Sequence, residues 1–152
     1  MKISVVRFRG LLILAVLLAT VTACGGPAAS GPDIRVEDAW GRPTPQMFDV
    51  AAFYMVLQNK GNEPDRLMGG KSPLCGVVEL HETYLTDDGA SGMRPVPGGF
   101  IEVPAGGQVE LKPGSYHIMC IDKAVDFNAG DKLPITLYFE KTGDKTLDIS
   151  IR

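Results

Sequence analysis

The chain has 152 residues, with 15 basic and 18 acidic side chains and a formal net charge of −3. Residues 1–23 hold three of the basic side chains and no acidic one, which leaves 12 basic against 18 acidic side chains, a net charge of −6, for residues 24–152. This negative surplus disfavours binding to nucleic acid and adsorption to anionic lipid, and it is compatible with a cation as cargo. The 129 residues after position 23 suffice for one domain with a core.

The N-terminus is typical of an exported lipoprotein. Basic residues precede an unbroken apolar run over 11–19. Residues 21–24, Val-Thr-Ala-Cys, then resemble the lipobox of bacterial lipoproteins, in which the cysteine is lipidated and becomes the new N-terminus. We therefore expect a lipoprotein signal peptide over 1–23, a lipid on Cys24 and a flexible tether over 24–33. The protein would be anchored on the outer side of the cell membrane or in the periplasm; a plain signal peptide with an ordinary thiol at Cys24 is the alternative.

Beyond the tether, the pattern predicts short strands separated by turns and no helix of useful length. Residues 50–59 are nearly continuously apolar, which is typical of a central strand buried on both faces. Alternating apolar residues over 133–139 and 147–151 predict a closing hairpin. The other expected strands are 34–40, 76–85, 92–96, 100–103, 108–111 and 116–122. About eight or nine strands at this spacing predict an all-β domain over residues 34–152, a Greek-key β-sandwich or barrel.

Alternation along the strands sorts the candidate metal ligands by face. In segment 116–120 the even-numbered residues are expected to face the core, so His117 and Met119 share the outer face, about 6.5 to 7 Å apart. The same alternation turns His81 outward, and Met93 in a turn-rich hairpin has no obvious core to fill. Solvated histidines and packed methionines are the alternative interpretation of this local pattern.

Six segments, taken in order and spacing, resemble one known family. They are LHET at 80–83, Asp-Asp-Gly at 87–89, MRPV at 93–96, VPAGG at 103–107, LKPGSYHIM at 111–119 and LYFEK at 137–141. The family is PCuAC, extracytoplasmic copper(I) chaperones of cupredoxin-like architecture, and the resemblance covers essentially all of residues 34–152. Its motif, a His, a Met about ten residues on and a His-x-Met roughly twenty further, maps onto His81, Met93, His117 and Met119. The intervals here are slightly longer, with eleven and twenty-three intervening residues.

The resemblance implies a metallochaperone that binds one Cu(I) through these four side chains, and Cu(II) more weakly. Soft thioethers with borderline imidazoles suit Cu(I). By resemblance, the recipient would be a copper-accepting protein such as cytochrome c oxidase subunit II, with a thioredoxin-like assembly factor as a further partner, and the chaperone would act as a monomer. No Ser-His-Asp, paired-carboxylate or P-loop arrangement indicates an enzyme. A metal-free β-sandwich lipoprotein that binds protein or solute is the alternative function.

The remaining polar and sulfur residues near these ligands leave alternatives open. Cys75 and Cys120 are the expected disulfide pair in an oxidising compartment. Strand parity turns the two cysteines to opposite faces, a conflict that a bend over 73–76 would remove. An inward Cys120 also argues against a blue-copper site. Glu79 and Glu82 either orient His81 or are solvated carboxylates. Met47 lies in a proline-flanked loop and is not expected to be a ligand.

Overall fold

The computed structural model describes residues 31–45 and 47–152. These residues form ten β-strands and no α-helix, which confirms the expected all-β sandwich. The strands are β1 (Ile34–Gly41), β2 (Val50–Asn59), β3 (Asp65–Lys71), β4 (Cys75–Leu85), β5 (Ser91–Pro95), β6 (Ile101–Val103), β7 (Gln108–Leu111), β8 (Tyr116–Lys123), β9 (Lys132–Phe139) and β10 (Gly143–Ile151). In this part of the chain, no helix is long and apolar enough to cross a membrane. The expected signal peptide over 1–23 and the lipidation site Cys24 lie outside the described residues.

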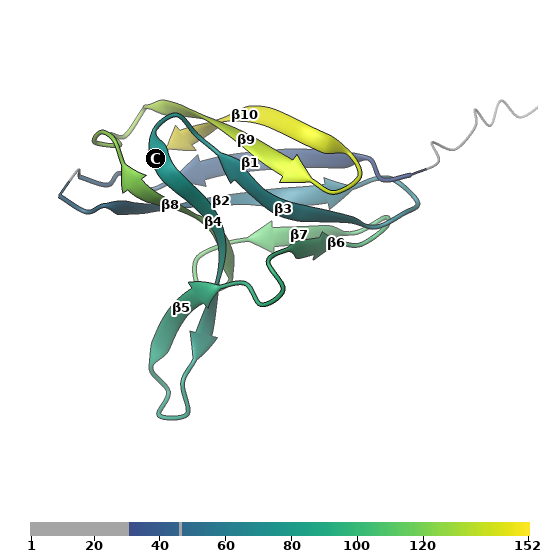
Figure 1. Ribbon diagram of the computed structural model, residues 1–152, viewed down its shortest axis with the longest axis horizontal. Helices are drawn as coiled ribbons and strands as arrows, with labels where there is room; N and C mark the ends of the chain where they lie inside the picture. The colour runs from purple at the N-terminus through teal and green to yellow at the C-terminus, as the bar shows by residue number, and fades with distance from the viewer. Residues whose placement is uncertain (1–30, 46) are drawn as a thin grey trace, which may run out of the picture.

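The strands form one sheet that folds over on itself into two layers (Figure 1). Their order is β5-β4-β8-β2-β1-β10-β9-β3-β6, and β7 pairs with β2 beside this path. The pairing of β1 with β10 is parallel, and β4 is antiparallel to both of its neighbours, β5 and β8. The β4–β5 hairpin projects from the body of the sandwich (Figure 1). One end of the sheet therefore combines a packed part, β4 with β8, and an exposed arm.

The core lies between the two layers. The expectation that residues 50–59 are buried on both faces holds only in part, because Ala52, Val56 and Gln58 on the second face are half-buried. On β2, Phe53, Met55 and Leu57 are at most 1% exposed. The closing hairpin is confirmed as β9 and β10, whose buried side chains are Leu133, Ile135, Leu137, Phe139, Ile149 and Ile151. Burying one such side chain contributes about 1.5–3 kcal/mol. A register slip of one residue would expose the whole row, so these strands have one strongly preferred register.

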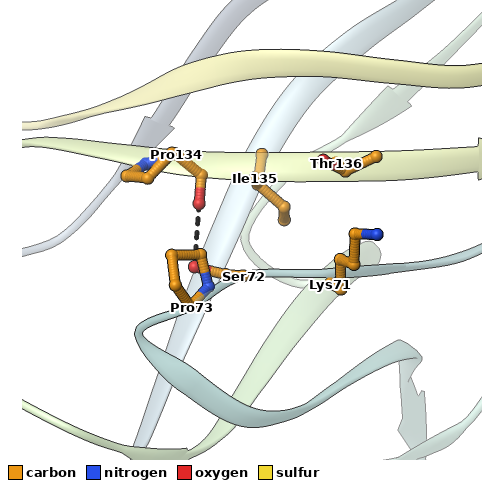
Figure 2. A pocket seen from close by; sticks show the side chains of 6 residues that line it. All are labelled: Lys71, Ser72, Pro73, Pro134, Ile135 and Thr136. Carbon is orange, nitrogen blue, oxygen red and sulfur yellow. Dashed lines mark hydrogen bonds between the residues drawn. The ribbon is translucent and has the colours of Figure 1, made fainter.

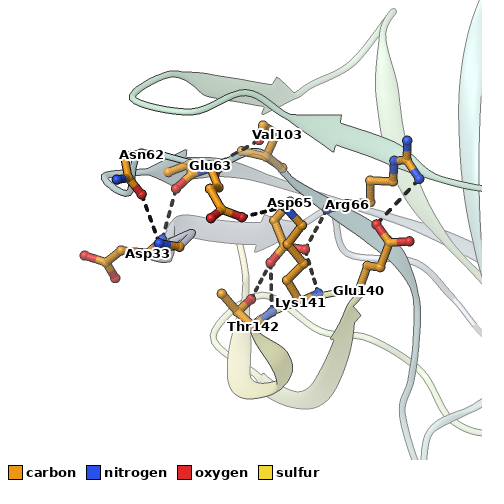
Figure 3. Close-up of polar contacts among 11 residues, drawn as sticks. Asp33, Asn62, Glu63, Asp65, Arg66, Val103, Glu140, Lys141 and Thr142 are labelled. Atoms are coloured by element: carbon orange, nitrogen blue, oxygen red, sulfur yellow. Dashed lines mark hydrogen bonds and ion pairs between the residues drawn. The ribbon is translucent and has the colours of Figure 1, made fainter. Parts of the chain in front are cut away.

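The strand β3 was not predicted, because its sequence DRLMGGK has little apolar alternation and two glycines. A buried carboxylate holds its start in place (Figure 3). Asp65 accepts hydrogen bonds from the backbone N–H groups of Arg66, Lys141 and Thr142, at 2.8, 2.9 and 3.0 Å, and from the Thr142 hydroxyl at 2.7 Å. Burial alone would raise the pKa of Asp65, but these four hydrogen bonds outweigh it and the pKa is lowered. Asp65 thus fastens β3 to the β9–β10 turn.

Residues 31–33, which were expected to belong to the flexible tether, already contact the domain. The backbone N–H of Asp33 donates to Asn59 Oδ1 at 3.0 Å, and that of Gly31 donates to Asn62 Oδ1 at 2.9 Å. Asn59 is 1% exposed, and its amide also donates to the Glu63 carbonyl at 2.8 Å. The last residues of the expected tether are therefore already bound to the loop that follows β2.

A disulfide joins Cys75, the first residue of β4, to Cys120 on β8, with 5.4 Å between their Cα atoms. Both strands depart from regular alternation near this bond. The N–H of Cys75 donates to the Ser72 carbonyl in a turn, and Asp122 on β8 has a φ of 52°. Cys75 consequently packs against the core with Cys120, although strand parity alone would turn it outward. The disulfide links the two strands that carry both histidines.

Candidate metal centre

His81 and His117 face each other across two neighbouring strands. In the antiparallel register of β4 and β8 they are direct partners, and their ring centroids are 5.9 Å apart. The residues on either side of His117, Tyr116 and Ile118, belong to the core side of β8. The two imidazoles therefore share the opposite face of the sheet, as the alternation predicted.

Each histidine uses one ring nitrogen in a hydrogen bond and leaves the other free. His117 Nδ1 lies 3.0 Å from the Ser115 carbonyl oxygen, and His81 Nε2 lies 2.8 Å from Glu79 Oε2. The remaining nitrogens, His81 Nδ1 and His117 Nε2, are buried and have no hydrogen-bond partner. Buried polar atoms without partners are rare, because each carries a desolvation penalty of about 1–3 kcal/mol. Two of them on facing rings are placed to bind one shared ligand.

The separation of the two rings fits a single metal ion. An ion held at about 2.0 Å by one nitrogen of each ring spans roughly 6 Å between ring centres, close to the 5.9 Å observed. The carbonyl of Ser115 can only accept a hydrogen bond, so His117 Nδ1 carries the proton and Nε2 presents its lone pair. The same holds for His81, where the Glu79 carboxylate accepts from Nε2–H and Nδ1 is left to bind.

The two methionines extend this pair along the same face in opposite directions. Met119 is the register partner of Glu79, and Met93 on β5 is the partner of Thr83. Both are thus diagonal neighbours of His81, a relation that places residues roughly 7–8 Å apart, within reach of long side chains. Met119 is 8% exposed, whereas Met93 is 61% exposed on the projecting hairpin. The structure thus brings both to the face of the histidines, and only Met93 reaches solvent freely.

A row of aromatic rings covers the histidine pair from the β2 side. The Tyr54 ring lies 6.4 Å from the His117 ring and 4.7 Å from the Trp40 ring, centroid to centroid. His117 is only 3% exposed as a result, and the side chain of His81 is 12% exposed. The sequence predicted the correct face but an exposed site, and that second expectation is wrong for His117 and Met119. Sequence reasoning also missed Trp40 and Tyr54, whose role depends on the pairing of β1, β2 and β8.

Burial sets the electrostatics of the pair. It lowers the pKa of His117, and the neighbouring His81 lowers it further, against an opposing effect of the hydrogen bond to the Ser115 carbonyl. His117 is therefore neutral at neutral pH, which is the form that binds metals. An uncharged, water-poor site made of imidazoles and thioethers suits a soft monovalent cation.

Other candidates lie apart from this face or are engaged elsewhere. Among the described residues, no group of three or more His, Cys, Asp or Glu side chains could hold a metal ion. Glu82 forms an ion pair with Arg94 at 2.8 Å. Cys75 and Cys120 form a disulfide, so neither can bind a metal as a thiolate. Met47 is 82% exposed and lies in a turn, not on one of the strands that carry the candidate ligands.

A pocket of about 280 Å³ lies between β3 and β9, away from the histidine pair (Figure 2). Figure 2 shows the Ser72 hydroxyl donating to the Pro134 carbonyl, at 2.8 Å. The lining residues are Lys71, Ser72, Pro73, Pro134, Ile135 and Thr136. Lysine is the only titratable side chain among them, so this pocket offers no ligand set comparable to the histidine face.

Comparison with known proteins places the chain in a family. The sequence profile of the LpqE-like family, described as "Putative lipoprotein LpqE-like", matches residues 34–151. The chain belongs to the LpqE-like family. This LpqE-like chain is 34% identical over 115 residues to "Uncharacterized protein RP573" of Rickettsia prowazekii, a match that covers 74% of the chain and 62% of that relative. The chain thus spans less than two thirds of the length of this relative.

Solved structures show that the LpqE-like chain has the fold of PCuAC domains. It is 28% identical to the copper-bound PCuAC domain from PmoF2, with a TM-score of 0.65, over 82% of the chain and 95% of that domain. It is 25% identical to CuI-DR1885 from Deinococcus radiodurans, with a TM-score of 0.64, over 86% of the chain and 85% of that protein. The resemblance found in the sequence motifs is therefore confirmed at the level of the fold.

Proposed function

We propose that this protein is an extracytoplasmic copper(I) chaperone that binds one ion through His81, His117, Met119 and Met93. The similar solved structures include a copper-bound PCuAC domain from PmoF2 and the CuI form of DR1885. The observation that carries the proposal is the pair of buried, unpartnered nitrogens, His81 Nδ1 and His117 Nε2, on rings 5.9 Å apart. An ion between them would satisfy both nitrogens at once.

The donor types favour Cu(I) over the common divalent ions. Thioethers are soft and uncharged, and imidazole is a borderline ligand that accepts either copper state. Zinc sites usually use thiolates, imidazoles and carboxylates, and the described residues contain no group of three or more such side chains that could hold an ion. The two cysteines form a disulfide, so no thiolate competes for the metal. Cu(II) would bind more weakly, because two of the four ligands are thioethers.

Unequal burial of the ligands suggests how the ion leaves. Three ligands sit in the packed part of the sheet, and Met93 lies on the projecting arm. Exposed apolar side chains flank the site on the same face. Val50 and Val77 both pair with Ile121, two residues beyond Met119, and Leu85 follows His81 by four residues on β4. Exposed apolar side chains on the face of a binding site offer a surface on which a partner protein can dock. An acceptor docking there would replace Met93 first.

The cellular setting forms part of the same proposal. The family of lipoproteins to which the chain belongs supports lipidation at Cys24, after removal of the signal peptide 1–23. The tether would then hold the domain at the outer side of the membrane. The copper centres of cytochrome c oxidase are the proposed destination, and that assignment draws on the PCuAC resemblance alone.

The decisive experiment is a titration of the apo protein with Cu(I) in competition with a chromophoric chelator. We expect binding of one ion per chain, and X-ray absorption of the loaded protein should show two nitrogen and two sulfur ligands. Absence of binding at 1:1, or binding that is unchanged in a Met93→Ala/Met119→Ala double variant, would refute the proposal. A metal-free binding module would then be the better description.

A further inference from the structure

The carboxylate of Glu79 occupies a specific place beside the histidine pair. Glu79 precedes His81 by two residues on β4, so both side chains leave the same face of the strand. Its Oε2 atom lies 2.8 Å from His81 Nε2, and its register partner across the sheet is Met119. The Glu79 side chain is 42% exposed, whereas that of His81 is 12% exposed. The carboxylate thus reaches from solvent into the edge of the site.

This contact fixes which nitrogen of His81 can bind a metal. A neutral imidazole carries one proton, and a carboxylate stabilises the tautomer that donates to it. With the proton on Nε2, the lone pair is on Nδ1, and that atom is the buried, unpartnered one. In His117 the opposite tautomer is stabilised, because Nδ1–H donates to the Ser115 carbonyl and Nε2 is left unpartnered. The two rings therefore present different nitrogens to the space between them.

We propose that Glu79 is a positioning residue of the copper site, which holds His81 so that Cu(I) is bound by His81 Nδ1 and His117 Nε2. This inference rests on the proposed function, since it concerns the same ion. Hydrogen bonds from metal-bound histidines to carboxylates fix ring orientation and increase ligand basicity. The negative charge of Glu79 also compensates the charge that the ion brings to a set of four neutral ligands. Its hard oxygen is a poor match for Cu(I), so Glu79 acts through His81 and not as a fifth ligand.

Two other carboxylates, Glu82 and Glu110, do not share this position. Glu82 is on the opposite face of β4 and binds Arg94. Glu110 on β7 makes its own contact at the same spacing of two residues, an ion pair with Lys112 at 2.7 Å. Because β7 pairs with β2 and not with β4, Glu110 is a matched control for the removal of an exposed, partnered carboxylate.

The direct test is the tautomeric state of each histidine, measured by long-range ¹H–¹⁵N NMR on protein with ¹⁵N-labelled histidine. Cu(I) is diamagnetic, so the apo and loaded forms are both observable. In the apo protein we expect the proton of His81 on Nε2 and that of His117 on Nδ1. On addition of Cu(I), the ¹⁵N resonances of His81 Nδ1 and His117 Nε2 should shift most. A proton on His81 Nδ1, or copper on His81 Nε2, would overturn the proposal.

Variants separate the geometric part of the role from the charge. Glu79→Gln retains an oxygen that accepts from Nε2–H, so the His81 tautomer should persist while Cu(I) affinity falls moderately. Glu79→Ala removes the acceptor, so the two His81 tautomers should mix, and affinity should fall about 10- to 100-fold, as for other partners of metal ligands. Glu110→Ala should leave both readouts unchanged. Equal affinity and an unmixed tautomer in Glu79→Ala would refute a positioning role.

The outcome also separates this inference from the proposed function. If the wild-type protein binds no Cu(I), the proposed function fails, whatever the tautomers are. If it binds Cu(I) at 1:1 and Glu79→Ala behaves like Glu110→Ala, the chaperone proposal stands and the role of Glu79 fails. X-ray absorption of the Glu79→Ala form should still count two nitrogen and two sulfur ligands. If the wild-type spectrum contained an oxygen ligand that was absent from the spectrum of Glu79→Ala, Glu79 would be a ligand itself. That result would contradict the positioning role.

Discussion

The two methionines of the site differ in burial, and the difference predicts two separable phenotypes. Met119 is 8% exposed, so Met119→Ala should remove about 2–5 kcal/mol from the free energy of unfolding. For a domain of this size, at about 4 °C per kcal/mol, the melting temperature of the apo protein should fall by roughly 8–20 °C. Met93 is 61% exposed, so Met93→Ala should change the unfolding free energy by no more than about 0.5 kcal/mol.

Copper binding should respond in both variants, despite this difference in stability. Each substitution removes a proposed ligand, so each should weaken Cu(I) binding by at least the ~10-fold that the loss of a hydrogen-bonded partner of a metal ligand produces. Met68 on β3 offers a matched control, because it is a 45% exposed methionine on a strand that does not pair with β4 or β8. Met68→Ala should leave both stability and affinity close to those of the wild type.

Thermal unfolding of the apo protein and chelator competition with Cu(I) measure the two quantities independently. Two results would refute the reasoning. If Met93→Ala bound Cu(I) as tightly as Met68→Ala does, Met93 would not be a ligand. If Met93→Ala lowered the melting temperature as much as Met119→Ala, the exposed position of the β4–β5 arm would be wrong, and the unequal release of ligands built on it would fail as well.

Three further predictions concern pH and stability. The pKa of His117 is lowered in the folded protein, so between the ordinary value of 6.5 and that lowered pKa the unfolded chain binds more protons than the folded one. The unfolding free energy should therefore fall as the pH drops through this window. In denaturant titrations, His117→Gln should flatten this dependence on pH. Replacing both Cys75 and Cys120 by alanine should remove about 4 kcal/mol from the free energy of unfolding, because the disulfide closes a loop with a sequence separation of 45. The variant keeps all four proposed copper ligands, so it should still bind Cu(I), but more weakly. A thiol assay of the unreduced wild type should find neither cysteine free. Asp65→Ala leaves four donors without their acceptor and should remove more than about 3 kcal/mol from the free energy of unfolding. Because the pKa of Asp65 is lowered in the folded protein, its contribution to stability should be present above the unfolded pKa and lost as the pH falls through the folded pKa.

Alternation along single strands explains what the sequence predicted well. A period of two is a local property, so the core row of the β9–β10 hairpin and the outward face of His117 were both predictable from a few neighbouring residues. The pairing of His81 with His117 could not be predicted in this way, because alternation indicates the face of a strand and not its register with a neighbour. The motif spacing supplied that link through the PCuAC resemblance, which the fold confirms.

Features that depend on distant contacts escaped the sequence analysis. The burial of His117 comes from Tyr54 and Trp40, which belong to strands far earlier in the chain. The strand β3 forms because β6 and β9 pair with it, and the buried Asp65 reaches the turn at Thr142, more than seventy residues away. Strand parity failed for Cys75, because a turn before it and a positive φ at Asp122 interrupt the alternation that parity assumes.

The strand β8 separates two kinds of sulfur chemistry by face. Cys120 points into the core, where it is fully buried in a disulfide, and the adjacent Met119 lies on the opposite face of the strand, which also carries His117. In an oxidising compartment a free thiol beside copper would itself be oxidised, whereas a thioether keeps its lone pairs for a soft ion. The disulfide also ties β8 to β4, so the bond that removes thiols from the site joins the two strands whose register sets the distance between His81 and His117. Loss of the disulfide should therefore loosen the proposed copper site and weaken Cu(I) binding, without removing any of the proposed ligands.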